Sequence, residues 1–202
     1  MLKYRFFLIL LTLMMTFTVS GQQDTKARDI LDKVAQNYNQ SNGVKISFKG
    51  TQQGTLWVKR EKFVLDCGGV KSWFDGKTQW SYIKENEEVN ISSPSQEEIQ
   101  AINPIILVTM YQHGFNYHYK GQKMHGGKRC NEITLQPINQ QDIRMFLLSV
   151  SENNIPLYIG IDLVNGHYEE FVIQTFEEKS LKDDFFQFDT NSFPDVEVID
   201  LR

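Results

Sequence analysis

The stretch GTLWVKREKF, residues 54–63, alternates between apolar and polar side chains in the way that a β-strand does. Because successive side chains of a strand point to opposite faces, Leu56, Val58 and Arg60 are expected to share one face. A guanidinium keeps its charge in a protein, and it is costly to bury without acceptors. The apolar row therefore either ends in solvent at Arg60 or leads into a cavity whose walls supply hydrogen-bond acceptors.

The same two-residue period extends over most of the chain and predicts an antiparallel meander. The breaks carry turn sequences such as Gly68-Gly69, Asp75-Gly76 and Gly121, at the spacing of hairpins. Residues 143–150 are apolar on both faces, so this strand needs cover on two sides. The other alternating segments are 44–48, 56–58, 63–67, 78–82, 89–91, 115–120, 129–135, 157–163 and 167–176.

Two helical regions interrupt this pattern. Residues 24–42 carry apolar side chains at three- and four-residue steps, and Gly43 follows as a stop signal. After Pro94, the sequence Ser95-Gln96-Glu97-Glu98 matches a capping box and introduces a second apolar helical pattern. A proline inside a helix removes a hydrogen bond, so two short helices hinged at Asn103-Pro104 are expected.

These patterns predict an α+β fold. The expected architecture is a strongly curved antiparallel sheet, an incomplete or half β-barrel, with helices that close its concave face as a lid. Such a sheet and its helices enclose a cavity lined by side chains. A chain of 202 residues has room for one domain of this kind, which we place at residues 22–202.

The first 21 residues have the composition of a secretory signal peptide. A basic start with Lys3 and Arg5 precedes an apolar run that is too short to span a membrane, and cleavage is expected near Ser20/Gly21. Removing Lys3 and Arg5 from the 21 basic residues leaves 19 against 25 acidic ones, a net charge of −6. This charge argues against nucleic acid as a partner. An exported, soluble chain is expected, with no lipidated cysteine at the cleavage site.

No constellation of catalytic or metal-binding residues stands out. His118 and His125 would approach each other across a hairpin at Gly121, but two histidines without a third ligand are a weak metal signal. Cys67 and Cys130 are permitted to form a disulfide in an oxidising compartment, and two small buried thiols are the equally acceptable alternative. We therefore expect no enzyme activity, no metal and no cofactor.

Three segments carry a resemblance to a known family. GTLWVKR at 54–60, FDGKTQWSY at 74–82 and INPIILV at 102–108 resemble, in that order, the strand, hairpin and lid segments of the periplasmic outer-membrane lipoprotein carrier family, LolA. The similarity covers nearly the whole mature chain, as far as FDTNSFPDVEVID at 188–200. The resemblance implies an incomplete barrel closed by a helical lid, whose hollow takes up the acyl chains of lipoproteins that cross the periplasm.

The resemblance also implies site residues. Arg60 is similar to the arginine of the family that latches the lid through its backbone carbonyls when the cavity is empty. This sequence departs from the family pattern at Glu61, where a proline is usual. The expected lid residues are Ile102, Pro104, Ile105, Ile106 and Met110, and the expected acyl-chain lining is Leu56, Val58, Phe63, Leu65, Trp80, Phe146 and Leu148.

The resemblance implies a monomeric periplasmic shuttle for lipoproteins, with an inner-membrane lipoprotein-releasing ABC transporter as donor and an outer-membrane acceptor. No ATP-binding motif is present, so an external donor supplies the energy. An envelope lipid-binding sensor, or a carrier of another hydrophobic molecule on the same fold, is the alternative. An exported hydrolase is a third reading, and it needs a polar constellation that the sequence does not show.

Overall fold

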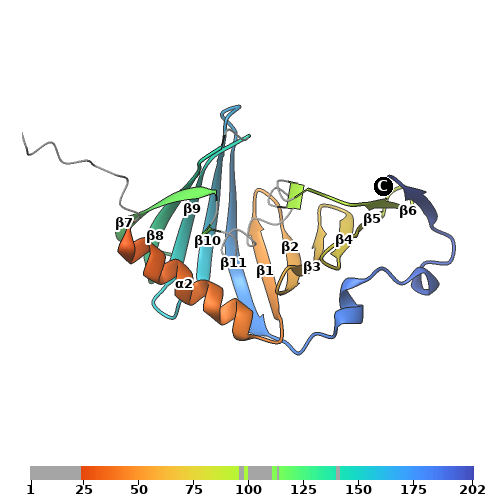
Figure 1. Ribbon diagram of the computed structural model, residues 1–202, viewed down its shortest axis with the longest axis horizontal. Coiled ribbons are helices and arrows are strands. Elements are labelled where there is room, and N and C mark those ends of the chain that lie inside the picture. Colours follow the sequence, from red (N-terminus) through yellow and green to blue (C-terminus); the bar gives the residue numbers. More distant parts are fainter. Residues whose placement is uncertain (1–23, 96–97, 100–110, 113, 140–141) are drawn as a thin grey trace, which may run out of the picture.

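The computed structural model describes residues 24–95, 98–99, 111–112, 114–139 and 142–202 (Figure 1). Within these ranges, twelve strands form one sheet and one α-helix, α2 (Thr25–Gln40), lies against it. The sheet order is β12-β6-β5-β4-β3-β2-β1-β11-β10-β9-β8-β7, so β12 and β7 are the two edges of an unclosed sheet. All neighbouring strands are antiparallel except β12 and β6, which are parallel.

The strands fall into two runs along the chain. The first run is β1 (Val44–Gly50), β2 (Gly54–Lys59), β3 (Lys62–Cys67), β4 (Val70–Phe74), β5 (Gln79–Ile83) and β6 (Glu88–Ser92). The second run is β7 (Phe115–His125), β8 (Lys128–Pro137), β9 (Ile143–Ser151), β10 (Pro156–Leu163), β11 (Tyr168–Glu178) and β12 (Glu197–Asp200). Strands β1 and β11 join the two runs in the middle of the sheet.

The predicted first helix is confirmed as α2. Asp24 caps its N-terminus, because one carboxylate oxygen, Oδ1, accepts hydrogen bonds from the backbone N–H groups of Lys26 and Ala27 at 3.0 and 3.1 Å. The helix ends at Gln40, and Gly43 follows with a φ of 133°. The apolar side of α2 faces the sheet, and its buried residues are Ala27, Ile30, Leu31, Val34, Ala35 and Tyr38.

Asp24 also attaches the start of α2 to the edge of the sheet. Its second oxygen, Oδ2, accepts a hydrogen bond from the backbone N–H of Tyr119 in β7 at 2.8 Å. This bond, and those from the helix N-terminus, hold the pKa of the Asp24 carboxyl below its ordinary value. One side chain therefore caps the helix and fixes it to β7.

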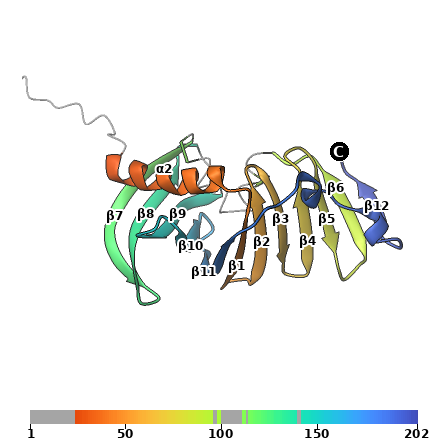
Figure 2. The same ribbon diagram turned by 90° about the horizontal axis from the view of Figure 1, so that it is seen from below.

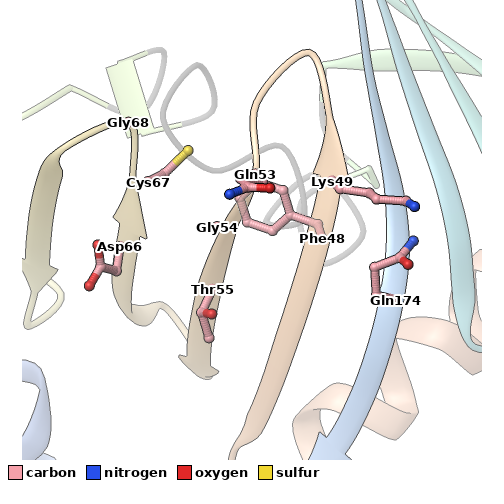
Figure 3. Close-up of a pocket in the computed structure, with 9 residues that line it drawn as sticks. All are labelled: Phe48, Lys49, Gln53, Gly54, Thr55, Asp66, Cys67, Gly68 and Gln174. Atoms are coloured by element: carbon pink, nitrogen blue, oxygen red, sulfur yellow. The ribbon is translucent and has the colours of Figure 1, made fainter.

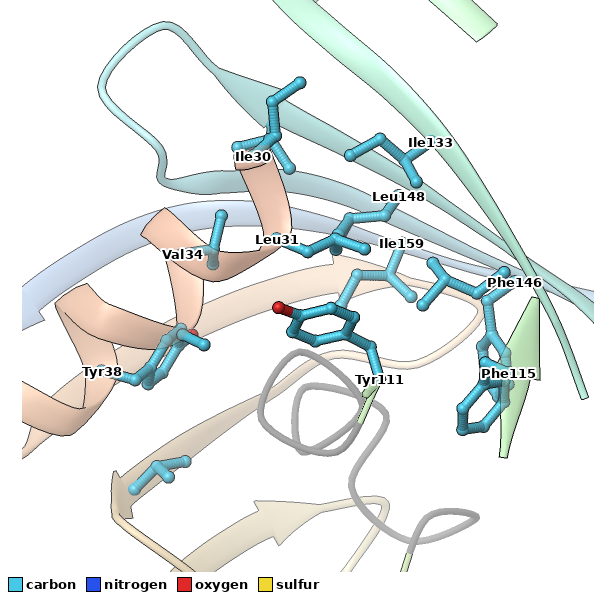
Figure 4. Close-up of a cluster of buried hydrophobic side chains, with 14 of the residues drawn as sticks. Ile30, Leu31, Val34, Tyr38, Tyr111, Phe115, Ile133, Phe146, Leu148 and Ile159 are labelled. Carbon is cyan, nitrogen blue, oxygen red and sulfur yellow. The ribbon is translucent and has the colours of Figure 1, made fainter. Parts of the chain in front are cut away.

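The buried side chains on the inner face, which we define as the face that carries α2, form the larger core. Figure 4 shows Leu31 of the helix lying beside Leu148 of β9 within this cluster. Tyr38 meets Phe176 edge to face, with 5.7 Å between the ring centroids. The helix and the strands β1–β4 and β7–β10 thus share one continuous apolar cluster.

A second, smaller cluster covers the outer face of β3 and β4. Val64 and Trp73 pack there against Phe186, which belongs to the C-terminal segment, residues 181–193. This segment runs across β2 to β5 on its way from β11 to β12 (Figure 2). Lys59 fixes it by donating to the Leu181 carbonyl at 2.7 Å and to Asp183 at 2.9 Å.

The predicted turn at Gly121 is wrong. Gly121 lies inside β7 with a φ of 105°, where the register of β7 on β8 shifts, so it forms a bulge rather than a hairpin turn. The hairpin turns at Gly126 and Gly127 instead. His118 and His125 consequently lie on the same strand, and not across a hairpin from each other.

Two strands went unpredicted, β4 and β12. The sheet itself is the predicted kind, strongly curved, antiparallel and unclosed, with a helix on its inner face. Of the predicted capping box, Ser95 and Glu98 are described, and they exchange two hydrogen bonds of 2.7 and 3.3 Å. The rest of the hinged helix pair, residues 100–110, lies outside the described residues, as does the predicted signal peptide.

The outer cluster predicts a sharp contrast between two neighbouring phenylalanines. The side chain of Phe186 is fully buried, whereas that of Phe185 is 39% exposed. We expect Phe186→Ala to lower the free energy of unfolding by about 3–5 kcal/mol, because it leaves a cavity between Val64 and Trp73. Urea denaturation measures this, with Phe185→Ala as the matched control; equal losses for both variants would show that the C-terminal segment is not packed on the sheet.

Asp24 predicts a pH-dependent contribution to stability. Its folded-state pKa is depressed, so its stabilisation is present at neutral pH and is lost as the pH falls through the folded-state pKa. Asp24→Ala should therefore lower the free energy of unfolding by about 0.5–2 kcal/mol at pH 7 and by much less at acid pH. Asp29→Ala, an exposed change on the same helix, is the control. A difference between wild type and Asp24→Ala that is independent of pH contradicts this role.

Candidate functional site

The inner face of β1 to β6 is organised in transverse rows of side chains. The strand register places Val58 of β2 opposite Phe63 of β3, and Phe63 opposite Phe74 of β4. The rings of Phe63 and Phe74 lie 5.4 Å apart, centroid to centroid. A second row runs parallel to the first through Ile46 and Leu56. Both rows are apolar from β1 to β3 and belong to the same apolar cluster as the buried residues of α2.

Most of the predicted lining residues lie on the inner face of the sheet, four of them on β2 and β3 and two on β9. Leu56, Val58, Phe63, Phe146 and Leu148 are buried in the inner core, and Leu65 is half-buried and packs against it. Their alternation with polar or outer-facing neighbours was the sequence signal that placed them. That these side chains contact an acyl chain stays a prediction.

Trp80 is the exception, and its predicted place with the inner lining is wrong. The register sets Trp80 opposite Trp73, which lies opposite Val64, and this row belongs to the outer face. Trp80 packs there against the cluster that the C-terminal segment covers. Its sequence neighbour Gln79 takes the inner position instead, because adjacent strand residues point to opposite faces.

Arg60 lies at the end of the opening stretch, in the turn between β2 and β3. Strand β2 ends at Lys59, and Arg60 adopts a φ of 56° with an exposed side chain. The apolar row of Leu56 and Val58 therefore ends in solvent, and the expected continuation of the strand face to Arg60 is wrong. Among the described residues, no hydrogen bond or ion pair engages its guanidinium.

The predicted lid residues Ile102, Pro104, Ile105, Ile106 and Met110 lie outside the described residues. The chain is described again at Tyr111, whose buried ring lies beside Tyr117 of β7. The Tyr111 hydroxyl donates a hydrogen bond to Asp32 of α2. Burial and this bond raise the pKa of Tyr111 to about 12, so the hydroxyl stays protonated at neutral pH.

The inner core also holds a polar atom without a partner. Among the described residues, nothing hydrogen-bonds to the buried hydroxyl of Tyr38. Burial raises the pKa of this group, which keeps it neutral. Apart from such isolated atoms, the inner face from β1 to β3 offers only apolar contact, which suits hydrocarbon better than a polar ligand.

A separate pocket of about 470 Å³ opens between β1, β2 and β3 (Figure 3). Its lining mixes Phe48 and Cys67 with polar side chains such as Lys49 and Gln174. The Cys67 thiol donates to Gln52 at 3.0 Å, and Cys130 is buried elsewhere, where its thiol donates to the Lys123 carbonyl at 3.3 Å. The two thiols do not form a disulfide in this structure. None of the predicted lining residues borders this pocket.

Within the described ranges, no group of three or more His, Cys, Asp or Glu side chains is arranged to hold a metal ion. In the same part of the chain, no helix is both long and apolar enough to cross a membrane.

The functional candidates that sequence reasoning missed are Gln79 and its polar neighbours on the inner face. Adjacent strand residues point to opposite faces, so placing Trp80 on the outer face would have placed Gln79 and Ser81 on the inner face.

Comparison with one solved structure supports the fold, and two further structures are similar to the chain at lower TM-scores. An uncharacterized conserved protein from Thermus thermophilus is 13% identical and superposes with a TM-score of 0.63 over 87% of this chain and 99% of that chain. A putative outer membrane lipoprotein-sorting protein domain from Vibrio parahaemolyticus is 9% identical, with a TM-score of 0.48 over 84% and 98%. Lipoprotein LppX from Mycobacterium tuberculosis is 13% identical, with a TM-score of 0.47 over 78% and 99%.

No curated protein matches the sequence. A family model does: the model described as outer membrane lipoprotein carrier protein LolA matches residues 15–128, more than half of the 202 residues. That range contains α2, the strands β1 to β6 and the whole of β7, and so most of the apolar inner face. The chain therefore belongs to the outer membrane lipoprotein carrier protein (LolA) family.

Proposed function

We propose that this protein is a periplasmic carrier that binds the acyl chains of lipoproteins on its inner face and shuttles them from the inner to the outer membrane. The observation that carries the proposal is the continuous apolar inner face of an unclosed sheet in a member of this family. Leu56, Val58, Phe63, Leu65, Phe146 and Leu148 supply the acyl-chain contacts.

Apolar contact suits a transient carrier. Each acyl methylene that leaves water contributes about 0.8 kcal/mol, so even a partly covered chain is held firmly against water. The cargo comes from one membrane and goes to another, so the protein competes with lipid rather than with water. Loose apolar contact with the acyl chains is therefore sufficient for transport, and close complementarity would slow their release to the membrane.

The remaining parts of the proposal follow the family. Residues 1–21 direct export and are removed near Ser20/Gly21. An inner-membrane lipoprotein-releasing ABC transporter loads the carrier, and an outer-membrane acceptor unloads it. The lid at residues 102–110 covers the inner face, and Arg60 latches it through backbone carbonyls in the empty state. The Arg60 side chain is exposed and has no hydrogen-bond partner among the described residues, which supports this role because a guanidinium carries five donors for such acceptors.

Acyl-chain binding predicts saturable uptake of a hydrophobic dye. The purified mature protein should bind bis-ANS with a defined stoichiometry, and a diacylated lipopeptide should displace the dye. Leu65→Asp, which places a charge on the half-buried inner face, should weaken both bis-ANS and lipopeptide binding at least tenfold, because an ionised carboxylate is costly beside hydrocarbon (roughly a 1.4 kcal/mol effect per tenfold). Fluorescence titration measures both affinities.

Val172→Asp is the matched control for this titration. Val172 is also half-buried, but the register sets it opposite Tyr158 on the outer face. It should leave dye and lipopeptide binding unchanged. If wild type binds no more bis-ANS than a compact protein of similar size, or if both variants lose binding equally, the inner face is not the acyl-chain site.

The latch predicts a defect in transfer without a defect in folding. Because Arg60 is exposed, Arg60→Leu should melt at the wild-type temperature. Loss of charge-assisted hydrogen bonds to the lid, worth roughly 1.5–3 kcal/mol, shifts the equilibrium toward the open or occupied form. The variant should therefore accumulate loaded with lipoprotein and deliver it slowly to outer-membrane vesicles.

Arg129→Leu is the control for the latch, because Arg129 is also exposed but lies near the β7–β8 turn. Transfer should proceed at the wild-type rate in this variant. Wild-type transfer by Arg60→Leu itself would show that Arg60 is a surface residue without a role in the lid, while leaving acyl-chain binding untouched.

A further inference from the structure

The two inner rows change character as they cross the sheet. The first row passes from Phe74 of β4 to Gln79 of β5 and Ser92 of β6. The second passes from Leu65 of β3 to Ser72 of β4, and then to Ser81 and Asn90. Along these two rows the side chains are apolar from β1 to β3, mixed at β4, where Phe74 is apolar and Ser72 polar, and polar at β5 and β6. An amphiphile, with hydrocarbon at one end and polar groups at the other, matches this order.

Gln79 is the most unusual member of the polar half. Its side chain is only 6% exposed, and its amide nitrogen donates to the Ser81 hydroxyl at 2.9 Å. Ser81 in turn shares a hydrogen bond of 3.1 Å with Ser72. Among the described residues, however, the Gln79 carbonyl oxygen Oε1 has no hydrogen-bond partner. A buried acceptor without a donor destabilises the protein and is rare in folded proteins, so a donor from a ligand is a physical reason for its presence.

Gln79 borders a pocket of about 650 Å³. This volume lies within the range typical of small-molecule sites. The pocket lies at the β6 end of the inner rows, and its remaining lining comes from the end of β6, the residues after it and the end of the chain. These residues are Ser92, Ser93, Pro94, Glu98, Leu201 and Arg202.

We propose that this pocket binds the polar head of the cargo, and that Gln79 accepts a hydrogen bond from an amide N–H or a hydroxyl next to the acyl chains. The inference rests on the proposed function and adds to it a site for the polar head group, which the apolar rows do not recognise. Phe74, directly opposite Gln79, belongs to the inner core, so hydrocarbon on β1 to β3 and a head group beside Gln79 lie on one continuous face.

A buried acceptor of this kind confers specificity. When a ligand supplies the donor, the Gln79 oxygen is satisfied; when the ligand lacks a donor, that oxygen stays buried and unpaired. A site built to hydrogen-bond a ligand therefore rejects the analogue that lacks the donor. The apolar rows bind any acyl chain, and Gln79 selects among the polar groups that follow it.

The test compares two pairs of ligands by displacement of bis-ANS from the mature protein. The hydroxyl pair is dioctanoylglycerol and its methyl ether, and the amide pair is N-dodecanoyl-alanine methyl ester and its N-methyl analogue. Wild type should bind the donor-bearing member of at least one pair about tenfold more tightly than the other. The pair that is discriminated identifies whether the recognised donor is a hydroxyl or an amide.

Gln79→Met removes the amide and keeps a similar shape. It should abolish the discrimination, leave the donor-free analogues bound as before, and melt at or above the wild-type temperature, because it removes an unpaired buried oxygen. Gln174→Met is the matched control, since Gln174 is exposed on β11, away from this pocket. It should retain the full discrimination.

Equal affinities within both pairs for the wild-type protein would overturn the inference and leave acyl-chain binding intact; this comparison needs no variant, so it holds even if Gln79→Met does not fold. Discrimination that persists in Gln79→Met would also overturn it, by assigning the selection to another group. Failure of every ligand and of bis-ANS to bind would contradict the proposed function itself.

Discussion

The structure depends on one constraint: strands β2 to β4 carry apolar side chains on both faces, so both faces of this part of the sheet must be covered. Leu56 and Phe63 point inward, whereas Trp57, Val64 and Trp73 point outward. The outer side chains meet the C-terminal segment, which Lys59 holds through the Leu181 carbonyl and Asp183. With the outer cover built from the chain itself, the inner face is the side that carries α2, and it is the face on which we propose that acyl chains bind.

The sequence was sufficient for what depends on local periodicity. The apolar steps of residues 24–42 predicted α2, and the alternation of Val44, Ile46 and Phe48 predicted β1. The inner positions of Leu56 and Val58 followed from the same alternation. Which side of a helix or strand is apolar depends on the spacing of apolar residues within that element, so a short stretch of sequence is enough to predict it.

The errors share a different cause. Trp80 was assigned to the inner face on its chemistry, but its face is set by its pairing with Trp73, and a change of one residue moves a side chain to the other side of the sheet. Glycine is typical of turns, but Gly121 forms a bulge inside the long strand β7. The pairing of β12 with β6 joins residues about a hundred positions apart, and no local pattern predicts such a contact.

The division of the inner face into an apolar and a polar half bears on how a carrier can be both permissive and selective. Hydrocarbon contact is non-directional and roughly proportional to area, so in the proposed carrier the rows through Val58 and Phe63 would hold acyl chains of different length with little discrimination. Hydrogen bonds are directional, so a single buried acceptor such as the Gln79 carbonyl oxygen distinguishes ligands that bury the same area. In the proposed site, the unpaired oxygen destabilises the protein without ligand, and a hydrogen bond from a matching ligand donor removes this destabilisation. Selectivity placed in one polar group therefore adds little to the affinity for the acyl chains, and a cargo chosen in this way can still leave for a membrane.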